Sequence, residues 1–329
     1  MSQDRSMQGQ VILTGGAGFI GSCFLWKLND VGITDIIVVD ALDSLLKEKN
    51  LAGKRFTDFI DKDDFLSQLS RKRFSGVRYI VHMGACSSTI LDDPEIYRRD
   101  NLEYSKSLGV WAYERKIRYL YASSAATYGD GAQGFDDSDQ VTPRLAPLNL
   151  YGRSKQDFDL WVLSQGLQRV FAGFKFFNVF GPNEYHKGPM RSIICKNYHS
   201  IEQEGKIRLF KSYKPEYEDG GQKRDFIYVK DAVDVMYYFF THPAVSGIFN
   251  VGTGCARTWN DLARAIFRAQ GKPAVIEYIG MPPELRSRYQ YFTQATVEKL
   301  RHAGYQRPFT SLEDAVLDYA RYLKADAHL

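Results

Sequence analysis

Short apolar segments alternate with segments of helical periodicity through the first half of the chain. We predict strands at residues 11–14, 36–39, 57–60, 79–83, 119–122 and 174–177. A helical pattern follows the first strand as far as residue 28, and others occur at 63–69, 103–114 and 154–166. Strands that alternate with helices indicate right-handed βαβ units and a parallel, doubly wound sheet. The fold class predicted for this half is therefore α/β.

The alternation becomes irregular from about residue 178. Prolines and the acidic, glycine-rich stretch 216–221 indicate loops rather than a linker between independent domains. We predict that 226–229 and 248–251 are strands returning to the main sheet, and that 259–270 and 311–324 are helices. The chain is therefore divided into a main domain, residues 1–177 and 226–256, and a smaller discontinuous α/β lobe, residues 178–225 and 257–329, that closes over a ligand.

A glycine-rich turn follows the first strand and opens the first helix. Its sequence is Gly15-Gly16-Ala17-Gly18-Phe19-Ile20-Gly21. Glycine lets the backbone approach a pyrophosphate, and the helix N-terminus offers unpaired N–H groups to the anion. In the order strand, turn, helix, this motif predicts a Rossmann-type NAD(P)-binding domain contacted through Gly15, Gly18, Phe19, Ile20 and Gly21.

Two residues after the second strand bear on which dinucleotide binds. Asp40 ends that strand, where an acid would accept hydrogen bonds from an adenosine ribose, as NAD sites prefer. Lys47 follows in the same loop and could instead bind a 2′-phosphate. The choice between NAD and NADP stays open.

Small and polar residues follow three further strands. They are 84–89, the segment 123–129 with its two serines, and 178–182, after which come His186 and Lys187. Ligands of a parallel sheet bind outside the carboxyl ends of its strands, so these segments should meet at one rim. One strand ending in small turn residues would be unremarkable in any protein, but three in one register indicate a binding site.

Tyr151 and Lys155 are four residues apart near the start of a predicted helix. At that spacing both side chains project from one helical face, and a cation beside a phenol lowers the phenol's pKa. The pair is therefore a candidate acid/base. The pattern is loose and also occurs on solvated helix faces, so it gains weight only from the glycine turn and from Ser124 at the same rim.

Composition excludes several other classes of protein. The chain has 329 residues with 44% hydrophobic and 25% charged residues, and its net charge of +4 is too small to indicate nucleic acid binding. Residues 1–9 do not resemble a signal peptide, and the apolar run 233–240 is too short to span a membrane, so we expect a cytoplasmic protein. The cysteines Cys23, Cys86, Cys195 and Cys255 lie far apart, which argues against a disulfide framework and a metal site.

Several motifs together resemble those of a known superfamily. Residues 14–21, 151–155 and 223–226 are similar to the extended short-chain dehydrogenase/reductases. More specific similarity, to the ADP-heptose 6-epimerase family of bacterial lipopolysaccharide core synthesis, lies in 84–89, 123–129, 177–182 with 186–188, and 288–290 with 292–294. The resemblance runs from about residue 11 to the C-terminal helix.

This resemblance implies a nucleotide-sugar epimerase with one tightly bound NADP or NAD per subunit. The cofactor takes a hydride from C6″ of ADP-heptose and returns it to the opposite face. By the resemblance, Tyr151 exchanges the hydroxyl proton, Lys155 lowers its pKa and holds the nicotinamide ribose, and Ser124 hydrogen-bonds the substrate oxygen. Lys187 matches a second acid/base, for which the alternative is a phosphate-binding loop lysine.

The resemblance assigns further residues to the two ligands and implies a homo-oligomer, with a pentamer as the family's example. Cofactor contacts are expected from Lys62, Gly84, Ala85, Ser87 and Asn101. Substrate contacts are expected from Ser87, Asn178, Val179, Lys196, Arg224 and Tyr289. The chain departs from the family pattern at Ala41, Met83, Pro189 and the longer loop 211–222.

Two other enzymes share the fold and the Tyr/Lys pair. A nucleotide-sugar 4,6-dehydratase needs a carboxylic acid beside the active-site hydroxyl, usually an Asp-Glu pair, and here those positions are Ala125 and Ala126. A UDP-hexose 4-epimerase has no need for Lys187. A non-catalytic NAD(P)-binding regulator would not be expected to retain Ser124, Tyr151 and Lys155 together.

Overall fold

The computed structural model describes residues 9–69, 74–286 and 289–329. Residues 1–8 and Arg288, both of which entered the sequence predictions, lie outside these ranges.

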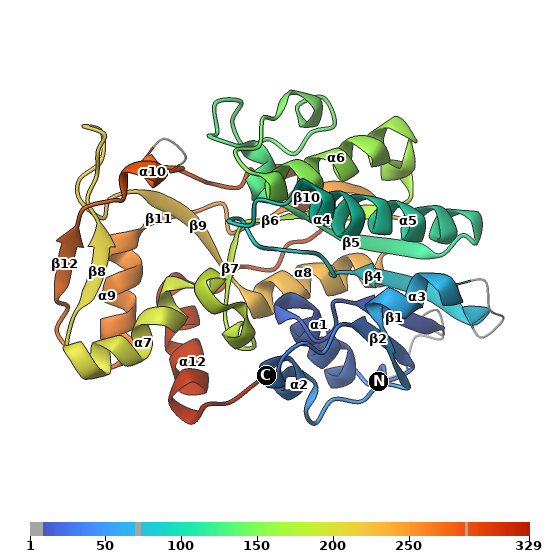
Figure 1. The fold of residues 1–329 in the computed structure, drawn as a ribbon, viewed down its shortest axis with the longest axis horizontal. Coiled ribbons are helices and arrows are strands. Elements are labelled where there is room, and N and C mark those ends of the chain that lie inside the picture. Colours follow the sequence, from blue (N-terminus) through green and yellow to red (C-terminus); the bar gives the residue numbers. More distant parts are fainter. Residues whose placement is uncertain (1–8, 70–73, 287–288) are drawn as a thin grey trace.

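Within the described residues, seven parallel strands form the main sheet (Figure 1). Along the sheet they are β3 (Asp58–Asp61), β2 (Ile36–Asp40), β1 (Gln10–Thr14), β4 (Val77–His82), β5 (Arg118–Ser124), β6 (Ala172–Phe176) and β10 (Gly247–Val251). The order reverses between β1 and β4, where the cofactor of a doubly wound sheet binds. The predicted α/β, Rossmann-type sheet is confirmed.

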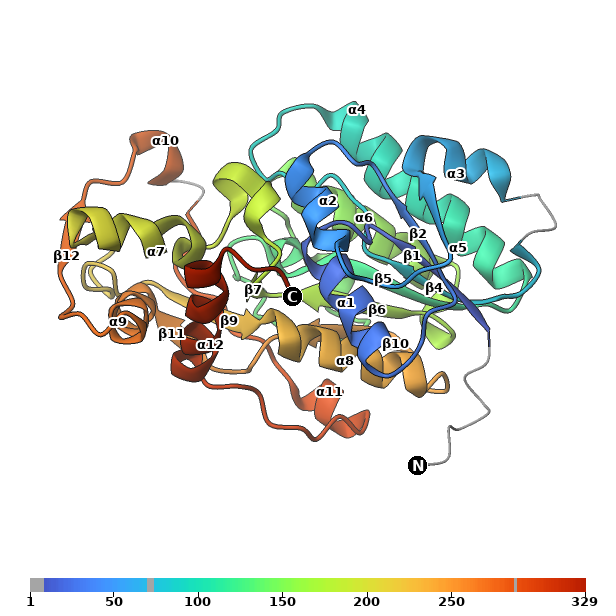
Figure 2. The same cartoon turned by 90° about the horizontal axis from the view of Figure 1, so that it is seen from below.

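Helices cover both faces of the main sheet, which explains why inner strands such as β1 are buried on both faces. Successive strand residues point to opposite faces, so Leu13 packs with Phe24 and Phe239 on one face, and Ile12 belongs to the cluster of Phe158 on the other. The first face carries α1 (Phe19–Asp30) and α8 (Val229–Thr241), and the second carries α3 (Lys62–Gln68), α5 (Tyr104–Glu114) and α6 (Leu150–Ser164). Figure 2 shows α1 and α8 on the side opposite α3 and α5.

The later part of the chain forms two smaller sheets beside the main one. One pairs β7 (Asn178–Phe180), β9 (Lys223–Tyr228) and β11 (Ala256–Thr258), and the other pairs β8 (Ile207–Phe210) with β12 (Ile276–Ile279). The remaining α-helices of the described residues are α2 (Leu45–Leu51), α4 (Pro94–Ile96), α7 (Ile193–Glu204), α9 (Trp259–Ala269), α10 (Pro283–Arg286), α11 (Glu298–His302) and α12 (Leu312–Ala325). The bounds given above for the main domain and the smaller lobe stay a prediction.

The prediction that 226–229 returns to the main sheet is wrong. Residues 226–228 belong to β9, which pairs in parallel with β7 and antiparallel with β11, and Val229 begins α8. The place beside β6 is taken by β10, as predicted for 248–251. An apolar run shows that a strand is buried, but periodicity does not say which of two sheets buries it.

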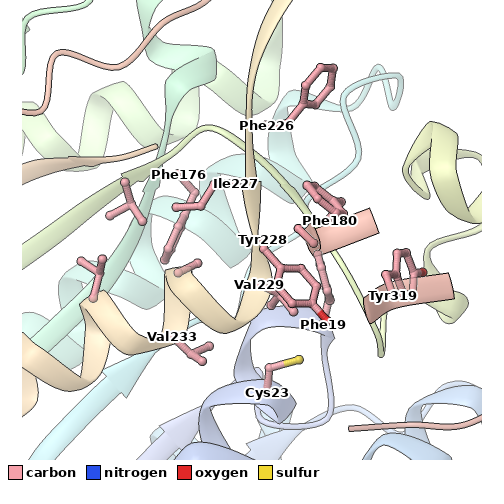
Figure 3. Packing of buried hydrophobic residues seen from close by; sticks show 14 of the residues in the cluster. Phe19, Cys23, Phe176, Phe180, Phe226, Ile227, Tyr228, Val229, Val233 and Tyr319 are labelled. Atoms are coloured by element: carbon pink, nitrogen blue, oxygen red, sulfur yellow. The ribbon is translucent and has the colours of Figure 1, made fainter. Parts of the chain in front are cut away.

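A shared apolar core joins the three-stranded sheet and α12 to the main sheet (Figure 3). The ring of Phe180 on β7 lies 5.6 Å from that of Tyr228 on β9 and 6.5 Å from that of Tyr319 on α12. Phe19, the first residue of α1, belongs to the same cluster. The first helix after the glycine turn is therefore packed against both parts of the molecule.

Each cysteine lies in the described ranges and is free. Among the helices that the structure describes, none is both long and apolar enough to cross a membrane. In the same ranges, no group of three or more His, Cys, Asp or Glu side chains could hold a metal ion.

Phe174→Ala should lower the free energy of unfolding by about 3–5 kcal/mol, because it leaves a cavity in a rigid core. Phe174 is fully buried in β6, with its ring 5.3 Å from that of Phe239. Urea denaturation measures the loss. Tyr113→Ala, at a position that is 58% exposed on the surface of α5, is the control and should change stability by no more than about 0.5 kcal/mol. Equal losses in the two variants would contradict the assignment of Phe174 to the core.

Candidate active site

A cavity of about 770 Å³ lies at the carboxyl edge of the main sheet, with α7 and α9 contributing to its lining. It brings together all four residues predicted to be catalytic, namely Ser124, Tyr151, Lys155 and Lys187. The other predicted site residues that line it are Gly15, Gly18, Phe19, Ile20, Gly21, Asp40, Lys47, Gly84, Ala85, Ser87, Asn178, Val179 and Lys196.

The glycine turn is held against the end of β4. Gly15 has φ +68°, and a Cβ atom there would lie 2.5 Å from the backbone nitrogen of Gly84. No side chain caps α1 at Gly18, so the N–H groups of its first turn are open to the cavity that Gly18 and Phe19 line. A 12-residue helix that begins in this way can bind the diphosphate of a dinucleotide.

Asp40 and Lys47 are paired with each other at one end of the cavity. Asp40 Oδ2 accepts hydrogen bonds from the backbone N–H groups of Ala17, at 2.9 Å, and Gly18, at 3.1 Å. Its Oδ1 lies 3.2 Å from Lys47 Nζ, which also contacts Asp43 at 3.1 Å. The carboxylate predicted to bind a ribose thus also fixes the glycine turn. Lys47, which could bind a 2′-phosphate, balances the negative charge of Asp40.

Tyr151 lies in the first turn of α6, where Asn149 sets the start of the helix by accepting a hydrogen bond from Gly152 N at 2.8 Å. A Cβ atom at position 152 would lie 2.7 Å from Ala126 O, so glycine lets this turn pack against the segment after Ser124. Ser124 Oγ accepts from Ala126 N at 3.1 Å. These contacts bring the phenol of Tyr151 next to the hydroxyl of Ser124.

Burial dominates the protonation of the Tyr/Lys pair. It raises the pKa of Tyr151, against which a hydrogen bond from Ser124 acts in the lowering direction. It lowers the pKa of Lys155 to about 8, with the negative charge of Asp159 opposing. The expected lowering of the Tyr151 pKa by Lys155 is not met in this structure, where Lys155 Nζ donates to Ala122 O at 2.8 Å.

Lys187 enters the cavity from the segment Tyr185–Met190 that follows β7. Its ammonium lies 5.4 Å from the centroid of the Phe19 ring, at the start of α1. Burial lowers the pKa of Lys187, and the buried carboxylate of Glu184 opposes this. Burial and the charges of Lys47 and Lys187 lower the pKa of His186 to about 4. The segment thus presents a desolvated amine beside a neutral imidazole.

Two asparagines fasten this segment to the glycine turn. Asn50 Nδ2 donates to Ala17 O at 3.0 Å and to Asn183 O at 3.1 Å, and it lies 3.3 Å from His186 Nδ1. Asn183 Nδ2 donates to Ser22 Oγ of α1 at 2.9 Å. The segment that carries Lys187 is therefore positioned by the same turn that would hold the cofactor.

Two predicted cofactor contacts do not line the cavity. Lys62 pairs with Asp63 at 2.7 Å and Asp100 at 3.9 Å. Asn101 is buried and bonds both backbone groups of Cys86, at 2.8 and 3.0 Å, and Ser154 Oγ at 2.9 Å. Asn101 thus supports the loop after β4, whose residues Gly84, Ala85 and Ser87 do line the cavity.

The predicted substrate contacts Arg224 and Tyr289 do not line the cavity but contact Trp259, which does. The Arg224 guanidinium lies 5.7 Å from the Trp259 ring and 5.2 Å from the Tyr289 ring. Trp259 Nε1 donates to the Tyr289 hydroxyl at 2.9 Å. These three side chains form one polar and aromatic cluster next to the cavity.

The sequence predictions missed Trp259 and Arg191 among the lining residues. Arg191 Nε donates to Gly188 O at 2.9 Å, and no carboxylate of the described residues pairs with its guanidinium. Lys196 Nζ donates to Pro189 O at 3.0 Å. The signal available in the sequence was the spacing of Lys187, Arg191 and Lys196, which puts three cations within ten residues after β7.

The electrostatic balance of the lining is positive. Among the described residues, Asp40 is the one acidic side chain that lines the cavity, and Lys47 neutralises it. Lys155, Lys187, Arg191 and Lys196 line other parts of it. The cavity can therefore hold anionic groups, such as diphosphates, beside a Tyr and a Lys that can exchange protons.

The chain is similar to known proteins over nearly its full length. Residues 11–252 match the NAD dependent epimerase/dehydratase family. A protein of Nitratidesulfovibrio vulgaris (strain Hildenborough) named ADP-L-glycero-D-manno-heptose-6-epimerase is 55% identical over 321 residues, 97% of this chain and 99% of that protein. A Fusobacterium nucleatum protein of the same name is 45% identical over 97% of this chain and all of its own length.

Solved structures give the same picture. The crystal structure of Helicobacter pylori ADP-L-glycero-D-manno-heptose-6-epimerase superposes with a TM-score of 0.80 at 27% identity, covering 98% of this chain and 99% of that one. The complex of Thermus thermophilus UDP-glucose 4-epimerase with NAD gives 0.75 at 23% identity, covering 96% of this chain and 99% of the other, and so shows the fold alone. The chain therefore belongs to the NAD dependent epimerase/dehydratase family, and within it to the group of the ADP-L-glycero-D-manno-heptose-6-epimerases.

Proposed function

We propose that this enzyme, an isomerase, inverts C6″ of ADP-D-glycero-D-manno-heptose to give ADP-L-glycero-D-manno-heptose, for the heptose of the lipopolysaccharide core. The observation that carries the proposal is that Tyr151, on α6, and Lys187, on the segment after β7, line one cavity. The relatives at 55% and 45% identity carry the name of this reaction.

NADP or NAD, which accepts a hydride from the sugar carbon and returns it, fits the observed lining. The open N-terminus of α1 would hold its diphosphate, the close approach of Gly15 to Gly84 leaves room for it, and Asp40 would accept from its ribose. Lys47 is placed to bind a 2′-phosphate only by giving up part of its contact with Asp40. One tightly bound cofactor per subunit, a homo-oligomer such as a pentamer, and a cytoplasmic location belong to the same proposal.

Inversion needs one group that removes the hydroxyl proton and another that returns a proton on the other side of the transient ketone. Burial raises the pKa of Tyr151 and lowers the pKa of Lys187, so the two shifts favour opposite proton-transfer roles, a phenol that gives a proton and an amine that takes one. Lys187 can take the proton of one epimer while Tyr151, hydrogen-bonded with Ser124, supplies the proton of the other. Exchange with solvent then restores both groups.

Two cations of the cavity lining, on and just before α7, would bind the nucleotide diphosphate of the substrate. Arg191 and Lys196 would bind its oxygens, and Arg224 with Tyr289 would contact the nucleotide beyond Trp259. Holding the nucleotide there leaves the heptose between Tyr151 and Lys187. Asn178 and Val179 also line the cavity and would contact the sugar.

A dehydratase is disfavoured because elimination of water needs a carboxylic acid at the sugar. The segment after Ser124 offers Ala125 and Ala126 in that place. In the described part of the lining the one carboxylate is Asp40, which is bonded to Ala17 N, Gly18 N and Lys47. The phenol of Tyr151 and the amine of Lys187 suit removal and return of a hydride. In the described part of the lining, no carboxylic acid is placed to protonate a leaving hydroxyl.

Incubation of the purified protein with the D-glycero epimer should give a mixture of the two C6″ epimers without net change in the cofactor. Proton NMR of the sugar follows the conversion, and absorbance of the reduced nicotinamide monitors the redox balance. A UDP-hexose serves as the competing substrate. Inversion of the UDP-hexose with none of the ADP-heptose would rule out the proposal.

Tyr151→Phe and Lys187→Met should each abolish epimerisation, because each leaves only one proton-exchanging group beside the ketone. Cofactor released on denaturation and measured by chromatography should stay at the wild-type level in both variants. Arg321→Ala, at a side chain that is 73% exposed on α12, is the control and should leave the rate unchanged. If Lys187→Met kept most of its activity, a scheme with two acid/bases would have to be abandoned.

Arg191→Ala should raise KM for the nucleotide-sugar with little change in kcat. Charge-assisted hydrogen bonds are worth about 1.5–3 kcal/mol, which corresponds to roughly 10- to 100-fold in affinity. Arg191→Lys should recover part of the loss, because a lysine keeps the charge but not the bidentate geometry. An unchanged KM in Arg191→Ala would show that this guanidinium does not contact the substrate.

A further inference from the structure

A fully buried ion pair lies next to the candidate active site and takes no part in the proposed proton transfers. Lys175, on β6, and Asp159, on α6, are both 0% exposed, and Lys175 Nζ lies 2.7 Å from Asp159 Oδ2. Neither side chain lines the cavity. Burying two charges costs several kcal/mol per ion, and an apolar pair of similar volume is often at least as stable. Stability alone is therefore a weak reason for this pair.

The pair holds the last residues of β5 through side-chain hydrogen bonds. Asp159 accepts from the Ser123 hydroxyl at 2.6 Å and from the Tyr121 hydroxyl at 3.0 Å. Lys175 also donates to Thr127 Oγ1 at 2.8 Å, and Thr127 Oγ1 donates to Ser124 O at 2.8 Å. The residues on either side of the Ser124 side chain are thus tied to one buried centre.

The same centre is one helical turn from Lys155. Lys155 and Asp159 are four residues apart on α6, and Lys155 Nζ donates to the carbonyl of Ala122. The end of β5 is consequently bonded to α6 at Tyr121, Ala122 and Ser123 in succession. A shift of β5 along α6 would have to break all three contacts.

We propose that Asp159 and Lys175 are positioning residues for the reaction, which fix the end of β5 on α6 so that Ser124 stays in register with Tyr151 and Lys155. The inference rests on the proposed function. The two acid/bases are then held by different contacts. Asn50 and Asn183 fix the segment of Lys187 to the glycine turn, and the buried pair fixes the surroundings of Tyr151. Neither residue touches a ligand in this scheme.

Asp159 also sets the charge that Lys155 experiences. The titratable groups around the Lys155 ammonium are Tyr151 and Asp159 on its own helix, His82 on β4, Tyr121 on β5, and Lys175 on β6 behind Asp159. His82 is neutral, because burial and the charge of Lys155 lower its pKa to about 3. The negative charge of Asp159 favours the ammonium form, so removing it should make Lys155 lose its proton at a lower pH.

Asp159→Asn and Lys175→Met should each lower kcat by roughly 100-fold, with KM for ADP-heptose changed by less than about threefold, because they disturb geometry rather than ligand contacts. In Asp159→Asn the alkaline limb of the kcat profile should move to lower pH. Lys175→Arg should restore most of the rate, since a guanidinium can bond both Asp159 and Thr127. Thr127→Val, which removes a single hydrogen bond of the network, should lower kcat in the same way but by less.

Arg118→Met is the matched control for a purely structural role. Arg118 is a buried cation at the start of β5, the end of the strand opposite to Ser124. It donates to Val170 O at 2.8 Å and Ser246 Oγ at 3.1 Å. The Arg118→Met variant should have a lower melting temperature and an unchanged pH profile of kcat. If Asp159→Asn and Lys175→Met behaved as Arg118→Met does, the pair would be structural only and the inference would fail.

The test distinguishes this failure from failure of the proposed function. Wild-type protein that does not interconvert the ADP-heptose epimers refutes the function itself. In that case the ultraviolet difference spectrum of tyrosinate formation, with Tyr151→Phe subtracted, still reports the environment of Tyr151. An identical Tyr151 titration in wild type, Asp159→Asn and Lys175→Met would overturn the positioning role. Should the stronger variants fail to fold, Thr127→Val supplies both readouts.

Discussion

Burial of cationic side chains at the carboxyl edge of the main sheet is the constraint on which the site depends. Taking an ammonium out of water is so costly that each buried lysine must have fixed partners. Lys155 has the Ala122 carbonyl, Lys175 has Asp159 and Thr127, and Lys187 has the face of Phe19 and the nearby charge of Glu184. Those partners lie on β5, α6, α1 and the segment after β7. Satisfying the charges therefore also fixes these elements relative to one another.

The chain crosses from the main sheet to the three-stranded sheet between β6 and β7, and the residues at this crossing line the cavity. β6 ends at Phe176 in the main sheet, and β7 begins at Asn178 in the second sheet. Phe177 between them donates its N–H to Val251 O of β10 at 3.0 Å, so the crossing point is bonded to the edge strand. Phe176 before the crossing, and Asn178, Val179 and Lys187 after it, all line the cavity. One continuous stretch of backbone thus supplies several parts of the lining.

Local patterns predicted the main sheet well because each carries its own physical cause. The glycine turn after β1, the acid that ends β2 and the small residues after β4 are all found at the edge of the cavity. The Tyr/Lys spacing also placed both side chains in it. These features depend on neighbours within a few residues along the chain. The same locality explains the success with β10, a buried run between a turn and a glycine-rich loop.

Features that depend on distant neighbours escaped prediction. β9 joins the three-stranded sheet because β7 and β11 lie beside it. The sequence of residues 223–228 alone is compatible with a strand in this sheet or in the main sheet. Motifs alone could not show that Asn101 supports a loop, or that Lys62 pairs with carboxylates away from the cavity. The raised pKa of Tyr151 has the same origin, since its main cause is burial. Desolvation is a property of the assembled core.

The two sets of contacts that support Tyr151 and Lys187, the proposed proton-exchanging groups, are separate from the side chains proposed to bind the nucleotide. Tyr151 is fixed through β5 and α6, and Lys187 through Asn50 and Asn183 to the glycine turn. Arg224, Trp259 and Tyr289, which would take the nucleotide, belong to the second sheet and the segments around it. A change in this latter group can alter which nucleotide-sugar is held without moving either proton-exchanging residue. The relative placement of Tyr151 and Lys187 thus rests on contacts that do not involve Arg224, Trp259 or Tyr289.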